Sequence, residues 1–209
     1  MSSGADVRLV FINKTMSVTP QTVLIFQKNI SPDLSTMIMA WKIIKDCPVD
    51  WSHSFIYPTQ LYVSCGDLHG NRMPRFAVQT GQALAVCKIG LTQKIIPSGQ
   101  AQSPYEFEVR NELPQGAIDI FIFRGPEMLC RKTSVSPGQK GVFAFEPTLW
   151  IGAVSQVEEG APLSSAIISQ TTTIIPLVGI KSADIVMTGG GAGEATTPYR
   201  FSLENIHPY

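Results

Sequence analysis

The sequence predicts an all-β protein of the β-sandwich type, with very little helix. Short apolar runs of strand-like composition recur roughly every fifteen residues, Gly, Pro, Asn and Asp separate them, and long helical patterns are nearly absent. Chains with turns this frequent build sandwiches or barrels. We therefore expect residues 1–209 to form a single compact β unit, built either as one sandwich or as two related halves packed together.

The expected strands are apolar runs that end at turn-forming residues. In chain order they are 7–12, 22–27, 37–44, 61–65, 83–88, 92–96, 105–111, 117–124, 128–134, 141–146, 149–155, 165–175, 183–188 and 199–203. The run 105–111 alternates, which predicts one solvated face bearing Glu106 and Glu108. The run 117–124 is almost continuously apolar, which predicts a strand buried on both faces.

The segment 31–45 carries signals for both helix and strand. Ser31 suits a helix cap and Pro32 suits the first helical position. Its apolar residues, however, also follow a period of two, and no charged outer face accompanies them. We expect a turn at 31–33 followed by a strand.

A short sequence pattern is repeated at an offset of 57 residues. Val78-Gln-Thr-Gly81-Gln82 matches Val135-Ser-Pro-Gly138-Gln139, each ahead of an apolar run, and the run 61–65 matches 118–122 at the same offset. Either a duplicated β unit or a common turn idiom would produce this pattern. The Gly-, Pro-, Ser- and Gln-rich segment 97–104 is the best candidate for a linker between halves 1–98 and 105–209.

Composition and charge exclude several classes of protein. Charged residues are 15% of the chain, against about 25% in ordinary soluble domains. Sixteen Lys and Arg balance sixteen Asp and Glu, so no basic excess points to nucleic acid. The 44% hydrophobic content argues against disorder. Weak self-repulsion favours a homo-oligomer.

Targeting and cofactor signals are missing from the sequence. The amino terminus lacks a signal-peptide pattern, and no apolar stretch reaches the length of a membrane span, which predicts a cytoplasmic protein without a membrane span. The four cysteines contain no Cys-x-x-Cys pair, so we expect neither a metal site nor a cofactor.

Catalytic motifs are equally scarce. The Gly-rich segment 188–198 lacks the Gly-Lys-Ser/Thr ending of a phosphate-binding loop, and we expect a flexible loop between two late strands. No Gly-x-Ser-x-Gly elbow occurs. We assign no catalytic residue, and the sequence leans away from an enzyme.

Two segments offer candidate ligand-binding residues. Trp51, His53 and Tyr57 lie in an aromatic stretch with polar neighbours, a combination that suits sugar faces, ligand rings or partner surfaces. Asp67 and His69 place a carboxylate beside an imidazole, although their spacing matches no metal motif. The competing interpretations are aromatics that cover the core and a hairpin turn at 67–71.

The turn-rich, weakly charged pattern resembles small β-sandwich proteins, lectin-like and membrane-active ones among them. We expect a non-enzymatic binding or interaction protein whose partner is a glycan, a small apolar molecule or another protein. One alternative is an enzyme with a dispersed or metal-assisted site near His53, Asp67 and His69. The other is a membrane-active or self-assembling β protein, favoured by neutral charge and many edge strands.

Overall fold

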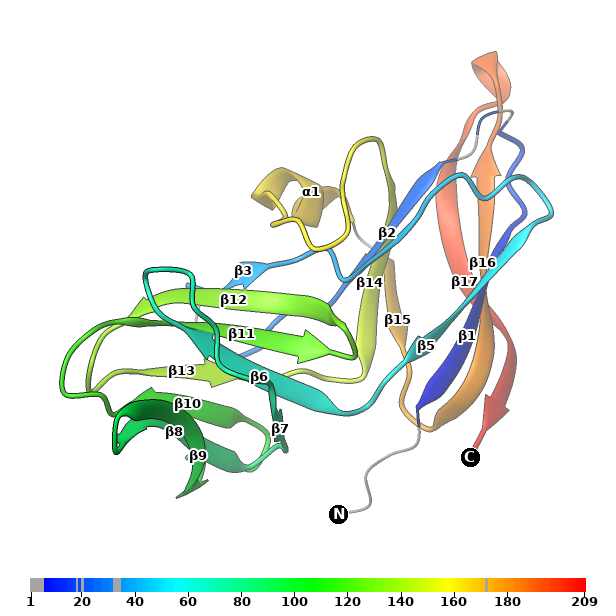
Figure 1. Ribbon diagram of the computed structural model, residues 1–209. Helices are drawn as coiled ribbons and strands as arrows, with labels where there is room; N and C mark the ends of the chain where they lie inside the picture. The colour runs from blue at the N-terminus through cyan, green and yellow to red at the C-terminus, as the bar shows by residue number, and fades with distance from the viewer. Residues whose placement is uncertain (1–5, 18, 20, 32–34, 172) are drawn as a thin grey trace. The chain divides into compact units, whose positions relative to one another are not determined.

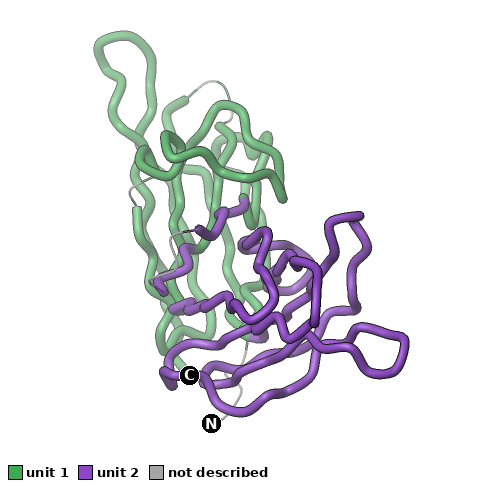
Figure 2. The backbone as a smooth tube through the Cα atoms, turned by 90° about the vertical axis from the view of Figure 1, so that its left-hand side faces the viewer, with its two compact units in different colours: residues 1–27, 40–59, 147–209 green, residues 28–39, 60–146 purple. Residues whose placement is uncertain are grey.

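A computed structural model describes residues 6–17, 19, 21–31, 35–171 and 173–209, and its elements are mostly strands (Figure 1). The expected all-β sandwich class is confirmed. The chain divides into two compact units, each built from segments that are distant in sequence (Figure 2). Unit 1 comprises residues 1–27, 40–59 and 147–209, and unit 2 comprises residues 28–39 and 60–146. The segment 97–104 lies within unit 2, where it contains the end of a strand and the turn after it.

Unit 1 contains two four-stranded sheets. The β1 sheet has the order β17-β16-β1-β5, and the β2 sheet has the order β15-β14-β2-β4. The elements are β1 (Val7–Asn13), β2 (Thr22–Phe26), β4 (Lys42–Ile44), β5 (Ser52–Tyr57), β14 (Thr148–Val154), α1 (Ser165–Gln170), β15 (Thr173–Pro176), β16 (Ile180–Gly190), the 3-10 turn η1 (Gly193–Ala195) and β17 (Thr197–Pro208).

The core of unit 1 forms where side chains of the two sheets meet. Alternate residues of β1 are buried, as a strand with one face against a core requires. Trp41, whose backbone N–H bonds to β2, packs edge-on against Phe55 and Tyr57 of β5. The Trp41 and Tyr57 ring centroids lie 5.9 Å apart. This aromatic cluster joins the β1 sheet to the β2 sheet.

Unit 2 also contains two sheets. The β8 sheet has the order β13-β10-β8-β9, and the β11 sheet has the order β3-β12-β11-β6-β7. The strands are β3 (Met37–Ile38), β6 (Leu61–Gly66), β7 (Phe76–Val78), β8 (Gln82–Ile89), β9 (Thr92–Gln100), β10 (Phe107–Asn111), β11 (Ile118–Arg124), β12 (Glu127–Val135) and β13 (Lys140–Phe143).

The central strand β11 is buried along its whole length, as its continuous apolar run predicts. Ile120 points inward and reaches the β8 sheet, where it lies so close to Gly141 that a side chain there would be crowded. Phe107 and Phe143 stack on neighbouring strands with ring centroids 5.4 Å apart. The contact of Ile120 with Gly141 joins the two sheets of unit 2, and the stacked rings of Phe107 and Phe143 connect two strands of the β8 sheet.

The short sequence pattern repeated at an offset of 57 residues corresponds to two turns of the same conformation. Gln82 N–H donates to the Gln79 carbonyl, and the side chain of Gln82 accepts from Gln79 N–H. The second copy repeats both bonds between Gln139 and Ser136. The intervening glycines have φ of +85° and +79°, a region that favours glycine. Both copies, including the matched strands β6 and β11, lie inside unit 2.

Three local expectations need correction. Residues 165–170 of the expected strand 165–175 form α1 instead, because Ser164 caps a helix there by accepting from Ile167 N–H. Residues 52–57, which are not among the expected strands, form the edge strand β5. The Gly-rich segment 188–198 does contain a loop between two late strands, but the loop is limited to residues 191–196, because β16 extends to Gly190 and β17 begins at Thr197. The turn expected at 31–33 lies largely outside the described residues, and β3 and β4 follow it as two short strands.

Candidate functional site

Three predicted ligand residues lie in unit 1, at or just before β5. Trp51 is 65% exposed and His53 is exposed, so both side chains are accessible to a partner. Tyr57 is buried, packs on Trp41 and accepts a hydrogen bond from Gln27 Nε2 at 3.2 Å. Tyr57 therefore belongs to the core, and only the first part of this aromatic segment faces solvent.

Asp67 and His69 lie in unit 2, in the turn between β6 and β7. Asp67 Oδ1 accepts from the backbone N–H groups of His69 and Asn71, and Asn71 Nδ2 donates to Oδ2 at 2.8 Å. The Asn71 side chain, helped by these backbone donors, holds the pKa of Asp67 below its ordinary value. The carboxylate thus closes a turn, and within the described ranges no group of three His, Cys, Asp or Glu residues could hold a metal ion.

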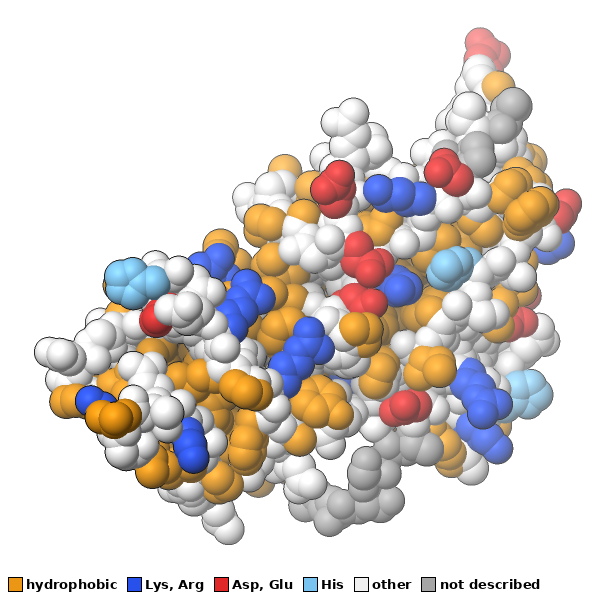
Figure 3. Space-filling view, in the orientation of Figure 1, with side chains coloured by type: hydrophobic (Ala, Val, Ile, Leu, Met, Phe, Trp, Pro, Cys, Tyr) orange, Lys and Arg blue, Asp and Glu red, His pale blue; other side chains and the backbone are white. Residues whose placement is uncertain are grey.

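Asp67 also lines a hollow of about 390 Å³ on the β11 sheet. The guanidinium of Arg72 lies 4.1 Å from the centre of the Phe121 ring, and that of Arg131 lies 5.3 Å from it. Arg131 is also paired with Asp119 at 2.5 Å. Figure 3 shows basic side chains over this sheet with apolar side chains beside them. The two arginines and two aspartates of this hollow balance, so it offers a ligand no net charge.

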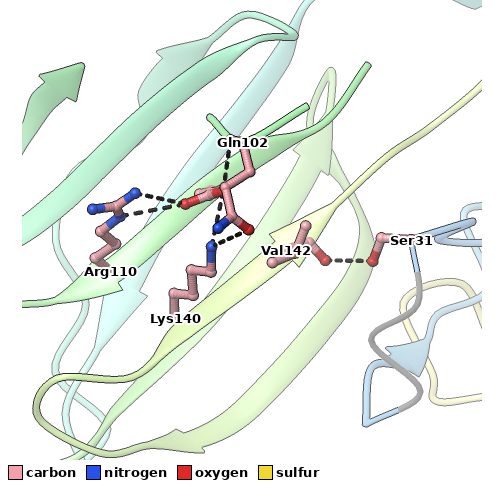
Figure 4. Close-up of polar contacts among 6 residues, drawn as sticks. Ser31, Gln102, Arg110, Lys140 and Val142 are labelled. Carbon is pink, nitrogen blue, oxygen red and sulfur yellow. Dashed lines mark hydrogen bonds and ion pairs between the residues drawn. The ribbon is translucent and has the colours of Figure 1, made fainter. Parts of the chain in front are cut away.

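A different cluster surrounds Glu108, a buried residue of β10. Its Oε1 accepts from Gln102 N–H at 2.9 Å and lies 3.0 Å from Lys140 Nζ. Its Oε2 accepts from Nη2 of Arg110 at 3.0 Å and from Nε at 3.3 Å. Figure 4 shows Arg110, Lys140 and Gln102 converging from neighbouring segments on this one carboxylate. Two cations are therefore held in place by a single buried anion.

The ionisation of Glu108 follows from these contacts. Burial by itself raises the pKa of Glu108, but the bonds from Gln102, Lys140 and Arg110 outweigh that effect and hold the pKa below its ordinary value. The side chain of Glu108 is 1% exposed, whereas those of Arg110 and Lys140 are 41% and 31% exposed. The negative charge is thus enclosed while both positive charges reach solvent.

These cations line a hollow of about 590 Å³ in unit 2. Its third cation is Lys132 of β12, whose Nζ donates to Ser35 Oγ at 2.6 Å. The lining residues are Gln102, Arg110, Lys132, Gly138, Gln139 and Lys140. Arg110 and Lys140 carry two positive charges against the single negative charge of Glu108, which leaves an excess of one positive charge. We refer to this feature as the Glu108 hollow.

The expected solvated face of 105–111 is wrong at its centre. Glu108 is fully buried, because Gln102 N–H, Arg110 and Lys140 contact its two carboxylate oxygens. The alternation of the run does place Glu108 and Arg110 on one face, two residues apart. The alternating pattern does not predict that Lys140 joins Glu108 and Arg110, because Lys140 comes near them only through the β10–β13 pairing.

Within the described part of the chain, no helix is long and apolar enough to cross a membrane. No protein-family model matches the chain, and the comparisons with curated proteins and with solved structures give no match either.

Proposed function

We propose that the protein is a non-enzymatic binding module whose Glu108 hollow takes an acidic ligand, namely a sulfated glycan. The observation that carries the proposal is the excess of positive charge around a buried carboxylate. Arg110 and Lys140 are already oriented by Glu108, so little of their freedom remains to be lost on binding. An anion entering the hollow would form charge-assisted hydrogen bonds with them.

The remaining lining favours a hydroxylated ligand over an apolar one. The side-chain oxygens of Gln102 and Gln139 accept from Lys140 Nζ and Ser136 N–H, so these amides face a ligand as NH2 donors, and Gly138 leaves its backbone accessible. Amide NH2 groups can donate to the oxygens of sugar hydroxyls and sulfates. A small apolar molecule would find few apolar groups among these residues, which is why a glycan is the better candidate.

The hydrogen bonds and the ionisation of Glu108 also favour binding without catalysis. Its oxygens are occupied by fixed donors, and its lowered pKa keeps it ionised near neutral pH. A general acid or base needs a pKa close to the working pH. Glu108 therefore serves as a positioning residue for the two cations.

The test is calorimetric titration with a trisulfated heparin-type disaccharide and with its unsulfated counterpart. We expect the wild-type protein to bind the sulfated sugar alone, with an affinity that falls as salt is added. The double variant R110Q/K140Q should bind about tenfold or more weakly, because charge-assisted hydrogen bonds are lost. Lys181→Gln, an exposed cation on β16 of unit 1, is the matched control and should bind as the wild type does. Equal binding by the double variant, or no preference for sulfate, would overturn the proposal.

A further inference from the structure

The β8–β9 hairpin ends in exposed apolar side chains. Leu91 is 95% exposed and Ile89 is 46% exposed, and between them Gly90 has φ of +63°, which turns the chain sharply. Ile89 pairs with Thr92, so the paired strands continue to the tip. Leu91 has the largest exposed fraction of the large apolar side chains that the structure describes.

The charged residues of the β8–β9 hairpin are all basic. Lys88 and Lys94 are exposed. Lys88 pairs with Gln93, and Cys87 pairs with Lys94, so the two lysines point to opposite faces of the hairpin. The whole segment 68–105 contains four Lys and Arg residues and no Asp or Glu. The tip is therefore apolar at its end and basic on both flanks.

A second apolar side chain lies at the same end of unit 2. Leu68, in the β6–β7 turn, is 67% exposed. It lines a hollow of about 400 Å³ together with Gln93 of the β8–β9 hairpin, Gly116 of the β10–β11 turn and its own neighbour Asp67, whose carboxylate is bonded within the β6–β7 turn. The β6–β7 turn and the hairpin thus present apolar side chains from neighbouring positions.

We propose that this end of unit 2 docks on an anionic lipid surface. Ile89, Leu91 and Leu68 would enter the boundary between headgroups and acyl chains, where apolar groups of peripheral proteins are buried. Lys88 and Lys94 lie within about three residues of the tip, or about 10 Å along a strand, and their long side chains can reach anionic headgroups. A protein partner is less suitable, because three side chains fall well short of the area of about 800 Å² per partner that a stable interface buries.

The experiment is co-sedimentation of the protein with vesicles of phosphatidylcholine alone and of phosphatidylcholine with one quarter phosphatidylserine. We expect the wild-type protein to bind the phosphatidylserine vesicles, with binding that weakens as salt is added. Leu91→Asp should lower the partition coefficient about tenfold or more, because a buried leucine is replaced by a charge. The double variant K88Q/K94Q should lose the preference for phosphatidylserine.

Two control variants test whether vesicle binding depends on this end of unit 2. Val178→Asp changes a 75% exposed apolar residue of unit 1 and should leave vesicle binding unchanged. R110Q/K140Q should also keep it, which distinguishes lipid docking from ligand binding in the Glu108 hollow. Absence of wild-type binding to phosphatidylserine vesicles, or equal binding by Leu91→Asp, would overturn the inference. The near-ultraviolet circular dichroism of each variant verifies that unit 2 remains folded.

Discussion

Lys140 lies directly opposite Arg110 across the β10–β13 pair, so two like charges are register partners. Such a pair destabilises a sheet when nothing compensates it. Glu108, two residues before Arg110, supplies the compensation by pairing with both cations, at 3.0 Å in each case. The sheet therefore tolerates a concentration of positive charge that stays available to solvent.

Replacing Glu108 by Gln should destabilise the protein by about 1–3 kcal/mol, because charge-assisted hydrogen bonds are lost at a buried position. Glu106→Gln is the matched control, since Glu106 is less buried, and its effect should stay within about 0.5 kcal/mol. Urea unfolding at pH 7 measures both changes. Equal stability of the two variants would show that Glu108 does not anchor the cluster.

The contribution of Glu108 should depend on pH in a defined direction. Its folded-state pKa is lowered, so its stabilisation is present above the unfolded-state value, about 4.3, and is lost as the pH falls through the folded-state pKa. The difference in unfolding free energy between the wild type and Glu108→Gln should be constant from pH 6 to 8, as a rough range. It should shrink as the pH drops below about 4. A difference that grew on acidification would contradict the assigned direction.

The fold class was predictable because it depends on local pattern, whereas the site was not. The continuous apolar run at 117–124 identified a buried strand, and the paired Gly81 and Gly138 turns were visible as an offset of 57 residues. The Glu108 hollow depends on the pairing of β10 with β13 and on the hydrogen bond from Gln102 N–H to the Glu108 side chain. Neither relationship can be recognised in the residue pattern of a single segment, because each joins residues that are separated in the sequence. The helix α1 was missed because six residues are too few to display a helical period.

Tyr57 and Trp51, which the sequence placed in one candidate site, should respond differently to substitution. Tyr57→Ala should cost about 3–5 kcal/mol, because it removes a buried aromatic ring beside Trp41. Trp51→Ala changes an exposed side chain and should shift stability by no more than about 0.5 kcal/mol. Thermal or urea unfolding of both variants compares them. A large loss for Trp51→Ala would contradict its position at the surface.

The repeated turns at Gly81 and Gly138 should lose equal stability when a Cβ is added at the glycine. Gly81→Ala and Gly138→Ala should each destabilise the protein by about 1 kcal/mol or more, because both positions have positive φ. A Cβ at either site meets no close contact, so backbone strain is the dominant cost. Urea midpoints of the two variants should agree closely. A neutral effect at one site alone would show that the two turns are not energetically equivalent.

The proposed anion site is tested most directly by mapping the backbone amides that respond to a ligand. The measurement is a two-dimensional ¹⁵N–¹H NMR titration of the assigned protein with the trisulfated disaccharide. We predict saturable shifts centred on Gln102, Gly138, Gln139 and Lys140, which line the Glu108 hollow. Saturable shifts centred instead on Trp51 and His53, or no saturable shifts in unit 2, would contradict the proposed site.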